Sequence, residues 1–252
     1  MKVLMIKMKI SIIITAKNEE YNLNRLLNSI YDLRKKVEVI VVDAGSTDKT
    51  RKVAKSFNFV KLINAPNTLR GEGRNIGIKK SKADIIVFLD ADTEVTKDWY
   101  PELEKSIKIF DIVAGYSPDP EGKDLPRVPI YIDGQDLTYP TCNIAYKKEI
   151  FDKVGYFRND MVTAEDIELN YRCVNAGYTI FYNPKMKVFH YQRKNFEGFA
   201  KQAFWNGYGR KHLNRLYPEL RNKHQHGIGV KNMFRLGFGF IGHTIGHLLK
   251  KF

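Results

Sequence analysis

The first 90 residues alternate between short, mostly apolar runs and longer stretches in which apolar residues recur every three or four positions. Short apolar runs bounded by polar residues predict buried β-strands. They cover residues 9–15, 37–42, 59–63 and 84–89. The stretches between them predict helices, because this spacing places the apolar residues on one helix face. These helices cover residues 19–34, 47–57 and 73–81.

This order of strands and helices predicts an α/β fold. A mainly parallel sheet would be covered by helices on both of its faces, as in Rossmann-like proteins. In sheets of this kind, ligands bind beyond the carboxyl ends of the strands. Polar residues that directly follow a predicted strand are therefore the first candidates for a functional site.

The regular pattern fades between residues 117 and 141. Here the proline-rich segment SPDPEGKDLPRVP predicts a long loop. Further elements are predicted beyond it, as helices over 147–154 and 163–176 and strands over 178–182 and 186–190. After residue 195 the chain becomes basic, aromatic and helix-prone. We therefore expect a sheet-containing domain over residues 1–195 and a helical extension over residues 196–252.

Positive charge is concentrated near the C-terminal end. The 252 residues carry a formal net charge of +14, and residues 191–252 hold 12 Lys and Arg against 2 acids, a net +10. Such a segment indicates an anionic partner, which can be acidic lipid headgroups, nucleic acid or a phosphorylated substrate. The only two cysteines lack metal-binding spacing, which favours a reducing compartment.

Neither end of the chain predicts a membrane-spanning helix. The N-terminal MKVLMIKMKISIIIT is interrupted by lysines and has no small-residue cleavage site, so it predicts a first strand rather than a signal peptide. No segment holds about 18 uncharged apolar residues in a row. Residues 236–249 are mostly apolar with basic and aromatic neighbours, which predicts an interfacial helix on an anionic membrane.

A polar segment, TAKNEE, follows the first predicted strand. Thr15 and Asn18 have groups that can bind a nucleobase or a sugar. The favoured interpretation of Asn18 is nevertheless a helix cap, with Glu19 and Glu20 at the positive end of the helix.

The second predicted strand ends in VVDAGSTDKT. A tight turn explains Gly45, and a cap on the next helix explains Ser46 and Thr47. Asp43 has no such structural explanation, because a carboxylate that ends a buried apolar strand needs a partner.

The next two motifs are GEGRNIGI, residues 71–78, and IIVFLDAD, residues 85–92. The first lacks the Lys-Ser/Thr pair of a phosphate-binding loop, but Arg74 offers planar donors for a nucleobase carbonyl or a phosphate. In the second, side-chain alternation places Asp90 and Asp92 on the same side of an extended chain. Such hard oxygen ligands suit Mg²⁺ or Mn²⁺ bound together with phosphates, although a strand followed by a helix cap has the same sequence.

Two further candidates lie later in the chain. In TAEDIELNYRCVNAGY, Thr163 and Asp166 fit a capping box, while Asp166 near a helix start also fits a general base. His190 ends a predicted strand; it is either a packing residue or a third metal ligand beside Asp92.

The order of these motifs resembles that of a family 2 glycosyltransferase with the GT-A fold. The resemblance covers roughly residues 9–193. It rests on the Thr-x-x-Asn-Glu segment, VVDAGSTD, G-x-x-R-N-x-G, FLDAD, N-x-A-x-x-x-x-x-F with a following Gly-x-F, Glu-Asp and the strand-end histidine. The family often has proline where this chain has Ala16.

The resemblance implies an inverting transfer of a sugar from a nucleotide-diphospho-sugar, with UDP favoured over GDP, to an acceptor hydroxyl. Its implied nucleotide-binding residues are Thr15, Ala16, Asn18, Glu19, Asp43, Ser46, Gly71, Arg74, Asp90 and Ala91. Its implied ligands for Mn²⁺ or Mg²⁺ are Asp92 and His190, with Asp90. Asp166 would remove the proton from the acceptor hydroxyl, and Glu165 would lie close to the acceptor.

The expected partners are the sugar donor and a lipid-linked or cell-surface saccharide acceptor. The expected location is the cytoplasm, at the inner face of the cell membrane. A nucleotidyltransferase would need a glycine-rich loop after the first strand, and TAKNEE has no glycine. A non-catalytic protein that binds nucleic acid or a sugar nucleotide through the basic tail would leave Asp43, Asp90, Asp92 and Asp166 unexplained, so nucleic acid is not an expected partner.

Overall fold

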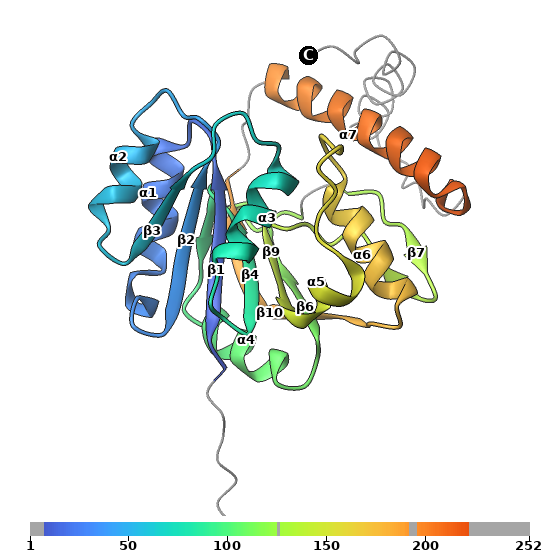
Figure 1. Ribbon diagram of the computed structural model, residues 1–252, viewed down its shortest axis with the longest axis horizontal. Helices are drawn as coiled ribbons and strands as arrows, with labels where there is room; N and C mark the ends of the chain where they lie inside the picture. Colours follow the sequence, from blue (N-terminus) through green and yellow to red (C-terminus); the bar gives the residue numbers. More distant parts are fainter. Residues whose placement is uncertain (1–7, 125–126, 192–195, 222–252) are drawn as a thin grey trace, which may run out of the picture.

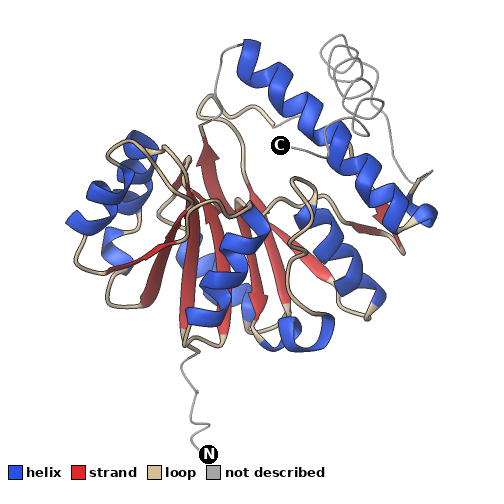
Figure 2. Cartoon of the chain, turned by 45° about the horizontal axis from the view of Figure 1, so that its top comes forward, coloured by secondary structure: helices blue, strands red, loops and turns tan. Residues whose placement is uncertain are grey.

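The fold is built on one eight-stranded sheet with helices on both faces (Figures 1 and 2). It is seen in a computed structural model that describes residues 8–124, 127–191 and 196–221. The strand order is β3-β2-β1-β4-β9-β6-β10-β5. Most neighbouring strands are parallel, and the predicted α/β class is confirmed.

The N-terminal half of the sheet follows the sequence pattern closely. Its parallel strands are β1 (Ile10–Ala16), β2 (Val37–Asp43), β3 (Val60–Asn64) and β4 (Ile85–Asp90). The connecting helices are α1 (Glu20–Ser29), α2 (Thr50–Ser56) and α3 (Arg70–Lys80), with a 3₁₀ turn, η1 (Tyr31–Leu33), after α1. Because the strands are parallel, all four end at the same edge of the sheet.

The C-terminal half contains the helices predicted over 147–154 and 163–176, together with elements that the pattern did not predict. Its elements are β5 (Thr93–Val95), α4 (Trp99–Ile107), β6 (Ile112–Tyr116), β7 (Tyr131–Ile132), β8 (Gln135–Asp136), β9 (Asn143–Lys147), α5 (Glu149–Val154), α6 (Glu165–Asn175) and β10 (Ile180–His190). Strand β9 pairs antiparallel with both neighbours. The two strands expected at 178–182 and 186–190 form one strand, with a register shift between Asn183 and Lys187.

The hydrophobic core lies on both faces of the sheet, and β1 shows how. Ile12 and Ile14 are fully buried on the face covered by α1, α2 and α4, while Ile13 is buried on the face covered by α3, α5 and α6. This is the two-residue alternation of a strand that is covered on both sides. A Cβ on Gly77 would lie 2.5 Å from the Ile13 side chain, so glycine lets α3 pack close to the sheet.

A long helix, α7 (Phe196–Leu216), and a 3₁₀ turn, η2 (Pro218–Leu220), end the described chain. Leu213 and Leu220 are fully buried in the same hydrophobic cluster as α5 and α6. The start of the expected helical extension is thus packed on the α6 side of the sheet (Figure 1). The predicted interfacial helix at 236–249 lies outside the described residues. Among the residues that are described, no helix is both long and apolar enough to span a membrane.

Candidate functional site

A pocket of about 540 Å³ opens where β1, β2 and β4 end. Its walls come from the loops that follow these strands and from the start of α3. They consist of Thr15, Ala16, Lys17, Asn18, Glu19, Val42, Ala44, Thr68, Leu69, Arg70, Gly73, Asp90, Ala91 and Asp92. The expectation that polar strand ends gather at one edge is therefore met.

Asn18 connects two of these loops instead of capping a helix. Its backbone has a left-handed φ of 56°, and its side-chain oxygen accepts a hydrogen bond of 2.8 Å from the backbone N–H of Thr47. Its own N–H donates to Ser46 Oγ over 2.9 Å. Helix α1 begins after Glu19 without a side-chain cap, so the predicted Asn18 cap is wrong. The predicted caps by Ser46 and Thr47 are also wrong, because α2 starts only at Thr50 and both residues bind Asn18.

Asp43 is completely buried at the end of β2, beside the pocket walls formed by Val42 and Ala44. One carboxylate oxygen, Oδ2, accepts hydrogen bonds from the N–H groups of Gly45, at 3.2 Å, and Ser46, at 3.0 Å. The predicted tight turn is present, since Gly45 has a φ of 88°. The other oxygen, Oδ1, has no hydrogen-bond partner among the described residues. A buried acceptor without a donor is costly, so Oδ1 is suited to a donor on a ligand.

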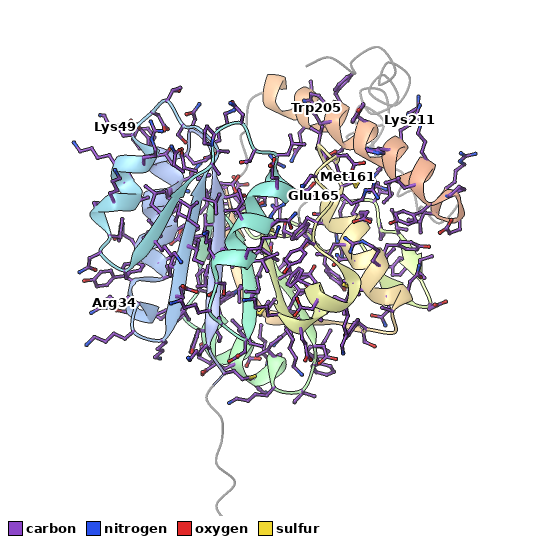
Figure 3. All side chains as sticks on the ribbon, viewed as in Figure 1. Arg34, Lys49, Met161, Glu165, Trp205 and Lys211 are labelled. Carbon is purple, nitrogen blue, oxygen red and sulfur yellow. The ribbon has the colours of Figure 1, made fainter. Side chains whose placement is uncertain are left out.

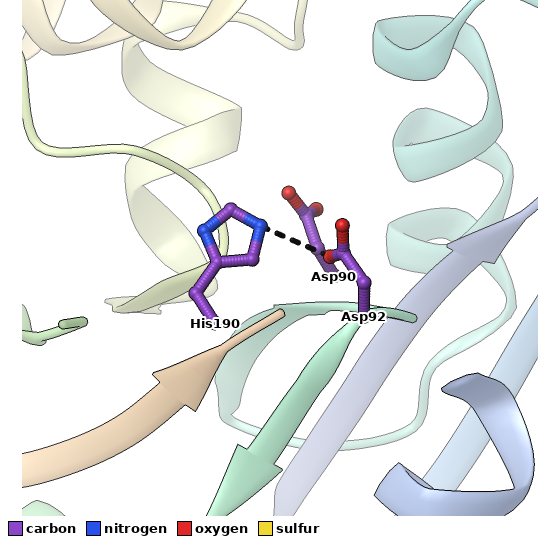
Figure 4. Close-up of side chains that lie close together, drawn as sticks. All are labelled: Asp90, Asp92 and His190. Atoms are coloured by element: carbon purple, nitrogen blue, oxygen red, sulfur yellow. Dashed lines mark ion pairs between the residues drawn. The ribbon is translucent and has the colours of Figure 1, made fainter. Parts of the chain in front are cut away.

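Asp90, Asp92 and His190 form a cluster that could hold a metal ion (Figure 4). Each offers one ligand atom, and the three atoms lie within 4.8 Å of one another. The antiparallel pairing of β5 with β10 brings them together, because it sets His190 opposite Thr93. In this arrangement His190 Nε2 lies 3.1 Å from Asp92 Oδ1. Two carboxylates and an imidazole are ligands that Mn²⁺ and Mg²⁺ sites accept.

Neighbouring groups shift the pKa values of His190 and Asp90 in opposite directions. Burial alone would lower the pKa of His190, but hydrogen bonding to Asp92 and Cys142 raises it to about 11. Burial alone would raise the pKa of Asp90, but the guanidinium of Arg74 lowers it below the ordinary value. Asp90 is therefore held ionised, as a metal ligand must be, whereas His190 carries a proton that it would have to release in order to coordinate a cation.

Arg74 lies outside the pocket walls and connects three elements. Its guanidinium is 3.2 Å from Asp90 Oδ1 at the end of β4 and 2.5 Å from Glu165 Oε1 at the start of α6. Arg74 and Glu165 are both almost fully buried. Gly71, one turn earlier in α3, makes room for this contact, because a Cβ there would lie 3.5 Å from the Glu165 side chain and 3.2 Å from Phe157.

Asp166 is the second residue of α6, next to this buried ion pair. Burial and the charge of Glu165 raise the pKa of Asp166 to about 6, although Arg74 acts in the opposite direction. Its Oδ1 accepts a hydrogen bond of 2.8 Å from the Ile167 N–H. The predicted capping box is wrong, because α6 begins after Ala164 without a side-chain cap and Thr163 Oγ1 donates to the Trp205 carbonyl.

Several pocket residues were missed by the sequence interpretation. Lys17 and Arg70 bring two cations to the pocket, and Thr68 and Leu69 complete the wall before α3. Lys17 lies within the TAKNEE segment, and Arg70 directly precedes GEGRNIGI, so both were adjacent to recognised motifs. No pattern singled out Thr68 or Leu69.

The profile of the family described as Glycosyl transferase family 2 matches residues 11–158. The chain belongs to this family. Glycosyltransferase AglE of Haloferax volcanii is 27% identical over 194 residues, which cover 68% of this chain and 63% of the relative. The probable glycosyltransferase YdaM of Bacillus subtilis is 26% identical, over 70% of this chain and 49% of the relative. The chain thus spans about half to two thirds of the length of these curated relatives.

Solved structures confirm the GT-A fold. The mannosyltransferase PcManGT from Pyrobaculum calidifontis, in complex with GDP-Man and Mn²⁺, superposes with a TM-score of 0.68 at 15% identity, covering 98% of this chain and 77% of that one. S. aureus TarS 1-349, in complex with UDP-GlcNAc, gives 0.67 at 19% identity, covering 96% and 76%. At identities this low, the superpositions establish the fold of this family 2 member.

Proposed function

We propose that this chain transfers a sugar from a nucleotide-diphospho-sugar to an acceptor hydroxyl, with inversion at the anomeric carbon. The observation that carries the proposal is the combination of one pocket with the Asp90–Asp92–His190 cluster at its edge. Two neighbours of known structure are bound to GDP-Man and UDP-GlcNAc, which supports a nucleotide-sugar donor. We favour UDP as the nucleotide and keep GDP as the second possibility.

The nucleoside end of the donor would lie against the loops after β1 and β2. Uracil and guanine both carry ring N–H donors, and the unpartnered Asp43 Oδ1 is an acceptor that such a donor would satisfy. Thr15, Ala16, Asn18 and Glu19 line the pocket from the end of β1 and the loop after it. Ser46 would act indirectly, since it holds both Asp43 and the Asn18 loop.

The diphosphate end would lie near the acidic cluster and the pocket cations. Asp92 and His190, with Asp90, would hold a Mn²⁺ or Mg²⁺ ion, which stabilises negative charge on a departing diphosphate. Lys17 and Arg70 add positive charge in the same pocket. Arg74 would contribute by keeping Asp90 ionised and in place rather than by direct contact with the nucleotide.

Asp166 would act as the general base. The acceptor hydroxyl gives its proton to the Asp166 carboxylate, and its oxygen bonds to the anomeric carbon. The bond from that carbon to the diphosphate oxygen breaks, and the nucleoside diphosphate leaves with the electron pair. One base is sufficient for such a single displacement, and a pKa near 6 leaves Asp166 largely ionised at neutral pH. Glu165 is held beside it by Arg74.

We also propose a peripheral contact with an anionic membrane through the basic segment 196–252, on the cytoplasmic face. The net charge of +10 over residues 191–252 supports it, since each basic residue near an anionic surface contributes about 1 kcal/mol. A lipid-linked or cell-surface saccharide is the acceptor class that fits such a location.

Calorimetric titration tests the donor site directly. We expect UDP or GDP to bind in the presence of Mn²⁺ and binding to weaken by at least about tenfold with chelator or in Asp92→Ala. Asp32→Ala is the matched control, because this carboxylate is fully exposed and remote from the cluster. Tight nucleotide binding that is unchanged by chelator and by Asp92→Ala would refute the metal site. Failure of both nucleotides to bind under any condition would refute the proposed function.

A further inference from the structure

The acidic cluster takes its three candidate ligands from two separate parts of the chain. Asp90 ends β4 and Asp92 lies in the turn after it, whereas His190 is the last residue of β10 (Figure 4). The two parts are joined at the edge of the sheet, where β5 pairs with β10 in a ladder of three residue pairs that ends with His190 and Thr93. A ladder this short opens easily, so contacts beyond it decide how firmly the ligands are held.

Tyr191 extends this ladder by one residue. Its backbone N–H donates to the Asp92 carbonyl over 2.8 Å, so the residue after His190 is bonded directly to a second candidate ligand. Its hydroxyl donates to Glu94 Oε2 over 2.5 Å. Glu94 is paired with Phe189, two residues before Tyr191, which places the Glu94 and Tyr191 side chains on the same face of the ladder. Tyr191 is therefore bonded to the opposite segment through both its backbone and its side chain.

Helix α1 holds the ring of Tyr191 in this position. The Arg25 guanidinium carbon lies 3.7 Å from the centroid of the ring, which is a close cation–π contact. Arg25 is itself oriented, because its Nη1 donates to Asn22 Oδ1 over 3.2 Å. One turn later, Ser29 Oγ accepts a hydrogen bond of 3.1 Å from the Val95 N–H. Arg25 and Ser29 share a helix face, so one face of α1 binds both β5 and the end of β10.

The same network reaches the wall of the pocket. Asn22 Nδ2 donates to Glu19 Oε2 over 2.7 Å, and Glu19 lines the pocket. The hydrophobic core does not account for this network, since Arg25, Glu94 and Tyr191 are all partly exposed. Contacts between partly exposed charged groups contribute little to stability. Their place beside the acidic cluster therefore indicates a role in the site.

We propose that Tyr191, held by Arg25 and Glu94, is a positioning residue that fixes Asp92 and His190 relative to each other for one small divalent cation. It acts through the backbone next to His190 and through the Asp92 carbonyl, so it is not itself a ligand. Groups that orient metal ligands in this way are typically worth about 10–100-fold in metal affinity. The assignment rests on the proposed function, because it takes the acidic cluster to be a metal site.

The first arm of the test concerns the site itself, so that its failure is seen separately. Binding of Mn²⁺ to the full chain is measured by electron paramagnetic resonance, because the signal of the hydrated ion disappears when the ion is bound. Wild type should remove this signal and Asp92→Ala should not. Equal signals from both chains would refute the metal site, and the proposed role of Tyr191 would fall with it.

The second arm concerns Tyr191. Tyr191→Ala should weaken Mn²⁺ binding by about tenfold or more, whereas Tyr191→Phe, which keeps the ring beside Arg25, should stay within about threefold of wild type. Arg25→Ala should weaken binding by about threefold or more, and alanine preserves the helix, so this variant decides the matter if Tyr191→Ala does not fold. Arg34→Ala is the matched control. It removes a guanidinium 4.0 Å from the Tyr31 ring, just before β2 at the opposite edge of the sheet (Figure 3).

Discrimination between ions separates positioning from a purely structural role. Mg²⁺ requires nearly octahedral ligands at about 2.0–2.1 Å, whereas Ca²⁺ accepts a looser shell at about 2.3–2.6 Å. In competition with Mn²⁺, Tyr191→Ala should therefore lose at least about threefold more affinity for Mg²⁺ than for Ca²⁺. Equal losses for the two ions would indicate a structural role and overturn the proposal. So would Mn²⁺ affinities within about twofold of wild type in both Tyr191→Ala and Arg25→Ala, and this result would leave the proposed function intact.

Discussion

Asp166 illustrates how a few neighbours can set the chemistry of one side chain. Burial and Glu165 disfavour its charge, while Arg74 favours it, and the balance leaves the pKa at about 6. Arg74 in turn neutralises Glu165 at 2.5 Å and reaches Asp90 at 3.2 Å. The buried Arg74 therefore connects the protonation of Asp166, the proposed base, with the charge of Asp90, and a change at either carboxylate is expected to affect the other.

The pH dependence of kcat/KM should report the pKa of Asp166 that these opposing effects produce. The proposed mechanism needs an ionised Asp166, so kcat/KM should fall as the pH drops through about 6. Glu165→Gln removes a negative neighbour, which should lower the pKa of Asp166 and move this acidic limb to lower pH. Asp166→Asn should reduce kcat by about 10²–10⁴-fold.

The same shift predicts an opposite effect on stability. The pKa of Asp166 is raised on folding, so its contribution to stability is fully present below about pH 4 and is lost as the pH rises through 6. Asp166→Asn should therefore raise the melting temperature at pH 7 and have a smaller effect at pH 4. An acidic limb that stays in place in Glu165→Gln, or a melting temperature that falls at pH 7, would contradict this account.

At the scale of elements, the close approach of α7 to Thr163 requires a glycine at position 209. In an exposed helix, Gly→Ala stabilises by about 1 kcal/mol. Gly209→Ala should instead destabilise the chain by about 1–3 kcal/mol, because its Cβ would collide with the Thr163 hydroxyl at 2.1 Å and with the Thr163 carbonyl oxygen at 2.7 Å. Urea unfolding measures the change.

Thr163→Ala provides the second arm of a double-mutant cycle. Alone it should cost about 1 kcal/mol, for the lost hydrogen bond to Trp205. Combined with Gly209→Ala it should relieve part of the collision, since the hydroxyl is gone and the Thr163 carbonyl remains. If Gly209→Ala raised the unfolding midpoint, as helix propensity alone predicts, α7 would not be docked as described.

The elements that could be predicted are those whose own residues determine them. Strands β1, β2 and β4 are nearly continuous apolar runs, and α1 buries Leu23, Leu26 and Leu27 on one face. Strand β9 was missed because it begins with Asn143, a polar residue that is buried only because Met186, Tyr116 and Trp99 satisfy its amide. Those partners lie far away in sequence, so no local pattern contains them.

The residues of the candidate site also divide into those that the local sequence could predict and those whose partners lie far away in the chain. The carboxylates Asp43, Asp90 and Asp92 stood out because each ends or closely follows an apolar strand, and the structure gathers them near one pocket. The capping interpretations of Asn18 and Thr163 were wrong because short polar side chains can bind many backbone groups. Their actual partners, Thr47 and Trp205, are 29 and 42 positions away. The spacing of residues in the sequence indicates which chemical groups are available. Only the fold shows whether their hydrogen bonds are made to neighbouring or to distant residues.

At the scale of the whole molecule, charge is distributed unevenly. The acidic cluster and the buried carboxylates lie at the strand ends, while the excess of Lys and Arg lies beyond residue 190. Part of this basic region belongs to the folded domain, since α7 and η2 bury Leu213 and Leu220. A truncation after Asn195 would remove these core residues and confuse loss of folding with loss of binding. A chain that ends at Arg221 keeps them.

Sedimentation with liposomes tests the membrane contact on that basis. Residues 222–252 hold five Lys and Arg and no acid. The full chain should therefore sediment with liposomes that contain about 30% anionic lipid, and should be released at high salt, because surface attraction is screened beyond a Debye length. Neutral liposomes are the control. The chain that ends at Arg221 should stay largely in solution while still binding nucleotide with Mn²⁺. Equal sedimentation of both chains would assign the contact to α7, and a full chain that stays in solution would refute the membrane proposal while leaving the donor site untouched.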